Sequence, residues 1–196
     1  NTADVARGGG RVDGQRRCQP VRLSSPPMTS PATPPESARA DAKLRVLAAR
    51  VVATRRAPYL ASMLFALRLV ASHPDQVHTV AVDDRWRLYY SPAFVMALDV
   101  EELATVLIHE AMHCMFSHSR RFGTVVSSGT TGSVALSTKH AVWNQVGDCA
   151  INEILDSIGM PFPKTAPGIR FADFPGMLIG PDKSSEVNYL EMLRYI

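Results

Sequence analysis

A pair of histidines with a glutamate between them is the part of this sequence best suited to chemistry. The stretch reads His109-Glu110-Ala111-Met112-His113. On a helix, residues four apart lie on one face, roughly 6 Å apart along the axis, so both imidazoles can bind one Zn²⁺ ion. Glu110 lies about 100° around the helix from His109, where it can act on a water molecule at the metal. The pattern therefore predicts a zinc site of the kind that zinc proteases carry.

The residues around this pattern are expected to form the helix that it requires. Asp99 and Glu102 have the spacing of a capping box, which predicts that the helix begins at Val100. The face with the two histidines also carries Met112 and Phe116, so we expect a dry site beside the core. The alternative to a zinc site is that the two histidines are ordinary helix residues that bind no metal.

A catalytic zinc site needs a third protein ligand, and Asp148 is the first candidate. It lies in a polar line with Asn144 and Asn152, at intervals of four, on a helix predicted over residues 138–158. The line borders Ile151, and a partly buried, unpaired carboxylate is costly unless a metal neutralises it. A helix edge rich in Asn and Asp that is hydrogen-bonded to a loop is the alternative.

Other ligands stay open. His140, near the start of the same helix, and Glu153 could replace Asp148 as the third ligand. His118 lies nine residues after His109, so on a continuous helix it would point to the opposite side. We therefore do not expect His118 to bind the metal.

Two further stretches accompany the histidine pattern. They read Asp-Asp-Arg-Trp-Arg-Leu-Tyr-Tyr-Ser-Pro-Ala-Phe-Val over residues 83–95 and Trp-Asn-x-x-x-Asp-x-x-Ile-Asn over residues 143–152. Together the three motifs resemble the zinc metallopeptidase domain usually found N-terminal to a von Willebrand factor A-like domain in bacterial and phage proteins. The resemblance implies that His109, His113 and Asp148 bind the metal. It also implies that Glu110 is the catalytic base and that the amides of Asn144 and Asn152 support the site.

The composition divides the chain into two parts. Residues 1–38 are rich in Gly, Pro and Arg and poor in large apolar residues, which predicts a disordered arm. Residues 39–196 are expected to form the metallopeptidase domain. A von Willebrand factor A-like domain does not occur in the 196 residues, so we expect a truncation before such a partner, which could also be a separate chain.

The periodicity predicts a small α+β, zincin-like domain with helices packed on a short antiparallel sheet. We expect helices over residues 40–56 and 58–71, a β-hairpin over 77–82 and 86–90, the helix with the histidines, a polar loop over 123–137, and helices over 138–158 and 186–195. In the first helix, Leu44, Leu47, Val51 and Val52 are expected to face inward. The strand over 86–90 could offer its edge to an extended peptide.

The charge and the cysteines limit the partners and the compartment. A net charge of +3 is too small and too diffuse to indicate nucleic acid, and no apolar run approaches membrane-spanning length. Three cysteines without a CxxC spacing, and no apolar secretory segment, favour a reducing compartment and predict a cytoplasmic protein.

These observations predict a zinc-dependent hydrolase, a metallopeptidase that cleaves peptide bonds in a protein or peptide substrate. The zinc ion would activate a water molecule, and Glu110 would accept its proton as the general base. Tyr89, Tyr90 and His140 are candidates for stabilising the oxyanion. Two alternatives stay open: a hydrolase for a non-peptide amide, and a metal-binding structural or interaction module without turnover.

Overall fold

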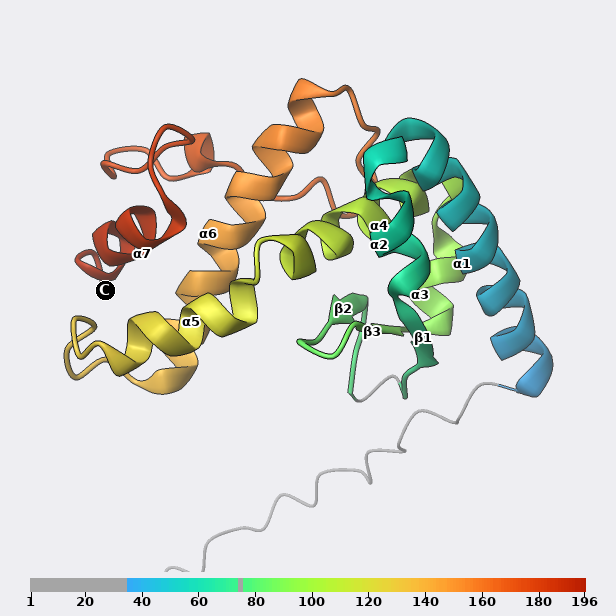
Figure 1. Cartoon of the computed structure of the whole chain (residues 1–196), viewed down its shortest axis with the longest axis horizontal. Coiled ribbons are helices and arrows are strands. Elements are labelled where there is room, and N and C mark those ends of the chain that lie inside the picture. Colours follow the sequence, from blue (N-terminus) through green and yellow to red (C-terminus); the bar gives the residue numbers. More distant parts are fainter. Residues whose placement is uncertain (1–34, 74–75) are drawn as a thin grey trace, which may run out of the picture. The chain divides into compact units, whose positions relative to one another are not determined.

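The computed structural model describes residues 35–73 and 76–196 (Figure 1). The predicted arm over residues 1–38 lies outside the described residues except for its last four, of which residues 36–38 already belong to the first helix. In chain order the elements are α1 (Glu36–Arg56), η1 (Pro58–Leu60), α2 (Ala61–Ala66), β1 (Arg68–Ala71), β2 (Val80–Val82), β3 (Arg87–Tyr90), α3 (Pro92–Ala97), α4 (Val100–Met115), α5 (His118–Ser127), α6 (Leu136–Ser157), η2 (Phe171–Asp173) and α7 (Ser185–Leu193). None of the helices that the structure describes combines the length and the apolar character that crossing a membrane would require.

The predicted α+β class is confirmed, but the sheet is mixed rather than antiparallel. Its strand order is β1-β3-β2, with β2 antiparallel and β1 parallel to β3. Residues 68–71, predicted as the end of a helix, form β1 instead. The chain leaves the helical conformation at Leu67, with ψ at 120°, and residues 68–71 then pair with β3. Pairing with a distant strand here outweighs the local apolar pattern that favoured a helix.

β1 and β2 are the two edge strands of the sheet. β3 is paired on both sides, so the expectation that residues 86–90 offer an edge is wrong. Thr79 accepts a backbone hydrogen bond from Ser91, and Asp83 donates one to Arg87. Because inward and outward backbone groups alternate along an antiparallel strand, the N–H and C=O groups of Val80 and Val82 point away from β3.

The first helix packs through small residues. α1 lies against α4 and buries Ala42, Val46, Ala49 and Ala53. Leu44, Leu47 and Val51, which we expected to face inward, are 65%, 38% and 47% exposed, and Val52 is half-buried. The prediction placed large apolar residues inward, whereas the buried face carries mostly alanines, which let the two helices approach closely.

Two hydrophobic cores share α6. Its C-terminal half contributes Ile151 and Leu155 to a core with α1, α2, the sheet and α4. Its N-terminal half contributes Val142, Trp143 and Val146 to a second core with α7. The helix therefore runs from one core into the other, and it crosses α4 on the way.

The helix with the histidines ends before His118, so that His118 belongs to a separate helix. α4 begins at Val100 with the predicted capping box of Asp99 and Glu102, and it ends at Met115. Ser117 then adopts a left-handed conformation, with φ at 52°, and α5 starts at His118. The predicted polar loop over 123–137 is shorter, because α5 extends to Ser127 and α6 begins at Leu136.

The capping box should be measurable in the stability of the chain. Asp99 accepts a hydrogen bond from the N–H of Glu102 at 2.7 Å, and Glu102 accepts one from the N–H of Asp99 at 3.1 Å. We expect Asp99→Ala to lower the free energy of unfolding by about 1 kcal/mol, measured by urea denaturation. Glu102→Gln keeps an acceptor at the third helical position and serves as the matched control. Equal stability of the alanine variant and the wild type would contradict the role of the cap.

Candidate metal centre

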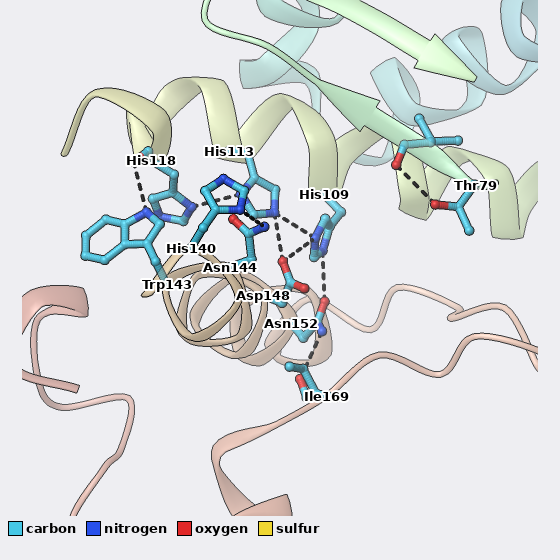
Figure 2. A network of polar contacts seen from close by, with 11 residues as sticks. Thr79, His109, His113, His118, His140, Trp143, Asn144, Asp148, Asn152 and Ile169 are labelled. Atoms are coloured by element: carbon cyan, nitrogen blue, oxygen red, sulfur yellow. Dashed lines mark hydrogen bonds and ion pairs between the residues drawn. The ribbon is translucent and has the colours of Figure 1, made fainter. Parts of the chain in front are cut away.

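Three of the predicted site residues come together where α4 crosses α6. His109 and His113 lie on successive turns of α4, and Asp148 approaches them from α6 (Figure 2). The Nε2 atoms of the two histidines are 2.9 Å apart. Asp148 Oδ1 lies 3.4 Å from His109 Nε2 and 3.0 Å from His113 Nε2. Each side chain thus directs one donor atom to a common point.

The spacing of these donors fits a single small ion. Ligands arranged tetrahedrally around Zn²⁺, with bonds of 2.0–2.1 Å, lie roughly 3.3 to 3.4 Å from one another. The three donor–donor distances of 2.9–3.4 Å are close to this value. Two imidazoles and one carboxylate also match the donor types that zinc takes in catalytic sites, where three protein ligands leave one position open.

Asn152 on α6 orients the first histidine. Its Oδ1 lies 2.9 Å from Nδ1 of His109, and its Nδ2 donates to the carbonyl of Ile169 at 2.9 Å. The second contact fixes the orientation of the amide, so the oxygen must face His109 and accept the Nδ1 proton. In the neutral form of His109, Nε2 is then the unprotonated nitrogen, which is the one that can bind a metal.

The loop behind Asn152 is shaped for this contact. Gly168 has φ at +74°, and a Cβ atom there would lie 2.6 Å from Nδ2 of Asn152. Only glycine combines this backbone conformation with such a close approach. The loop is tied back to α6 by Arg170, which forms an ion pair with Asp156 at 2.8 Å.

The surroundings of Asp148 favour its ionised form. Burial alone would raise its pKa, but the contacts with His109 and His113 outweigh burial and hold the pKa well below its usual range. The side chain is 37% exposed, against 17% for each of the two histidines. A metal ion bound here would thus meet a negative charge beside two imidazoles.

Glu110 lies beside the ligands and is held by the sheet. Its carboxylate accepts a hydrogen bond from the backbone N–H of Val82, an outward-facing group on the free edge of β2. Burial raises the pKa of Glu110, whereas the nearby histidines act in the opposite direction. The carboxylate is therefore fixed between the ligands and the edge strand, without belonging to the ligand set.

His118 lies against the side of His113 that faces away from Asp148. This contact was not predicted from the sequence. Nδ1 of His118 is 2.9 Å from Nδ1 of His113. The prediction assumed a continuous helix, but the break at Ser117 turns the chain back toward the site. His118 still contributes no atom to the ligand cluster, because it contacts the nitrogen of His113 that faces away from Asp148. Burial, with His113 and Arg121, lowers the pKa of His118 to about 3.

The other candidate ligands lie apart from the three donors. His140 and Glu153 are not in the cluster formed by the described residues. Asn144, which the resemblance implied as a support, is exposed and contacts His140 at 3.4 Å instead. The thiols next to the ligands in sequence, Cys114 and Cys149, are not in that cluster either. Burial raises the pKa of Cys114 to about 11 and that of Cys149 to about 12, so both thiols are neutral without a metal.

A cleft of about 1040 Å³ opens over the cluster. It is lined by the edge strand β2 with Trp86 and Phe94. Further lining residues are Phe162, Pro163, Ala166, Gly168 and Ile169. His140 lines the cleft as well. Tyr89 and Tyr90, the other two candidates for the oxyanion, do not: Tyr89 donates to Asp83 at 3.3 Å, and Tyr90 is buried in the core.

The role of Asn152 can be tested by removing its amide. We expect Asn152→Leu to weaken Zn²⁺ binding ten- to hundredfold, because His109 loses the acceptor that fixes its tautomer. The measurement is a zinc titration in competition with a chromophoric chelator. Asn144→Leu, on the same line of α6 but without contact to the ligands, is the matched control and should bind zinc like the wild type. A loss of similar size in both variants would contradict this role of Asn152.

Comparisons with known proteins agree with this geometry. The sequence model of one family, described as "Putative metallopeptidase domain", matches residues 41–172, which is more than half of the chain. The matched range contains all four residues predicted for ligands and base. The comparisons with curated proteins and with solved structures gave no match. The predicted family is confirmed: the chain belongs to the family of this metallopeptidase domain.

Proposed function

We propose that the chain is a zinc-dependent peptidase whose metal is bound by His109, His113 and Asp148. The observation that carries the proposal is the convergence of the three donor atoms at distances that suit one ion, at the base of an open cleft. The membership in a metallopeptidase family supports the same reading. A bound Zn²⁺ ion would supply Lewis acidity, which polarises a carbonyl and lowers the pKa of a water ligand toward about 7.

Glu110 is the general base in this proposal. It follows His109 directly on α4, and its carboxylate is anchored by Val82 at the wall of the cleft. In this position it can accept a proton from the attacking water and later deliver it to the leaving amine. Burial favours its neutral form, which makes the carboxylate more basic than an exposed glutamate.

The edge of β2 favours an extended peptide as the substrate. The N–H of Val80 and the C=O of Val82 also point away from β3 and border the cleft, next to the N–H of Val82 that donates to Glu110. A peptide that pairs with this edge is held by main-chain hydrogen bonds, which place its carbonyls in a row along the cleft. This arrangement favours peptide bonds over an isolated small amide.

His140 is the proposed donor to the oxyanion. Among the three side chains considered for this role, it alone lines the cleft. The amide of Asn144 lies 3.4 Å from its Nδ1 and can donate to that atom. His140 then carries its proton on Nε2, where it can donate a hydrogen bond to a developing negative charge.

Metal analysis tests the ligand set. We expect the wild-type chain to bind one equivalent of zinc, and His109→Ala, His113→Ala and Asp148→Ala each to lose it, because two remaining donors bind weakly. Glu153→Ala is the control carboxylate on the same helix and should retain zinc. Inductively coupled plasma mass spectrometry after dialysis measures the metal. Retained zinc in both histidine variants would contradict the assignment of the ligands. Iron found in place of zinc would keep the ligands but identify the metal as Fe(II), which two histidines and a carboxylate also bind.

Activity is tested separately from metal binding. We expect Glu110→Gln to keep zinc and to lose cleavage of a mixed peptide library by a factor of about 10² to 10⁴, which is the usual contribution of a general base. Treatment of the wild type with a chelator should abolish cleavage, and zinc should restore it. A wild type that binds zinc and cleaves no peptide would favour the structural or interaction module instead.

A further inference from the structure

We propose that His118 is a positioning residue that holds His113 in the tautomer able to bind the metal. The inference rests on the metal site proposed above. It adds to that site a third histidine, which does not touch the ion.

The contact between the two rings constrains where their protons lie. Nδ1 of His113 and Nδ1 of His118 are 2.9 Å apart, so one of them donates and the other accepts. A metal bound to Nε2 of His113 requires that nitrogen to be unprotonated. Neutral His113 then carries its proton on Nδ1 and donates it to His118.

The ring of His118 is held rigidly enough to act as this acceptor. The side chain is 5% exposed and packs between Phe116, with centroids 5.7 Å apart, and Trp143, at 6.2 Å. The backbone carbonyl of His118 accepts a hydrogen bond from the indole of Trp143 at 2.9 Å. Both the ring and the backbone of this residue are therefore fixed relative to α6.

Glycine at position 147 makes this placement possible. A Cβ atom at Gly147 would lie 2.8 Å from Nδ1 and 2.9 Å from Cε1 of His118. The space for the ring therefore depends on a missing side chain in the middle of α6. Glycine in a helix interior is destabilising by roughly 1 kcal/mol relative to alanine, so its presence here agrees with a need for that space.

The two histidine ligands are thus supported in the same way from different elements. Asn152 accepts the Nδ1 proton of His109, and His118 accepts that of His113. Partners of this kind usually contribute ten- to hundredfold to metal affinity.

The experiment measures zinc affinity in the full chain by chelator competition. His118→Phe fills the same space without an acceptor and should weaken zinc binding ten- to hundredfold. His118→Asn places an amide oxygen near the position of Nδ1 and should bind zinc within about threefold of the wild type. Cobalt(II) spectra of the same variants report whether the metal keeps its ligand geometry, and urea denaturation without metal reports whether the fold is intact.

Gly147→Ala provides an independent variant. Alanine favours the helix, so weaker zinc binding in this variant cannot come from a loss of helical propensity. We expect a decrease in affinity of about tenfold alone and no further decrease when it is combined with His118→Phe, since both act on one ring.

The outcomes separate the two proposals. Wild-type affinity in His118→Phe, or equal losses in His118→Phe and His118→Asn, would overturn the positioning role while leaving the metal site intact. If His118→Phe does not fold, wild-type affinity in Gly147→Ala would overturn it. A wild type that binds no zinc would instead refute the proposed function, and the role of His118 with it.

Discussion

A carboxylate and two imidazoles meet inside the crossing of two helices, and the neighbouring structure depends on satisfying them there. Packing α4 against α6 removes Asp148, His109 and His113 from most of the surrounding water, which is costly for a charge unless it is paired. The contacts of the two histidines with Asp148 stabilise its charge. The Nδ1 atoms of both histidines face away from Asp148 and need partners of their own. Asn152 and His118 occupy those positions. The loop around Gly168 and the break at Ser117 are the backbone features that make both contacts possible.

The features that could be predicted from the sequence are those that lie within a single helix, either α4 or α6. The capping box at Asp99 follows from residue types three apart, and the histidine pair and the alignment of Asp148 with Asn152 on α6 follow from a period of 3.6 residues. Asn144 continues that line, but it is exposed and contacts His140 instead of the ligands. Asp148 was the first candidate for the third ligand because its position on the predicted helix, next to the apolar face, indicated where its side chain would point. Its distance from His109 along the chain carried no such information.

The features that were missed depend on contacts between elements. Nothing in the local sequence marks the break after Met115, since Ser117 is not a residue type that usually adopts a left-handed conformation. Without that break His118 points away from the site, so its contact with His113 could not be derived. β1 was missed for a related reason, because residues 68–71 become a strand only through pairing with β3, a partner more than a dozen residues away.

The two hydrophobic cores have a consequence for how the chain would lose its structure. α6 contributes its two halves to different cores, and the donor atoms lie near the point where it passes from one to the other. An ion held there binds only when α4 and α6 are both in place. Its binding free energy therefore stabilises the packing that joins the two cores, and not one core by itself. With metal, the cores are expected to unfold as one cooperative unit. Without it, the core around Trp143 and Tyr189 becomes free to open first, as a region of lower local stability.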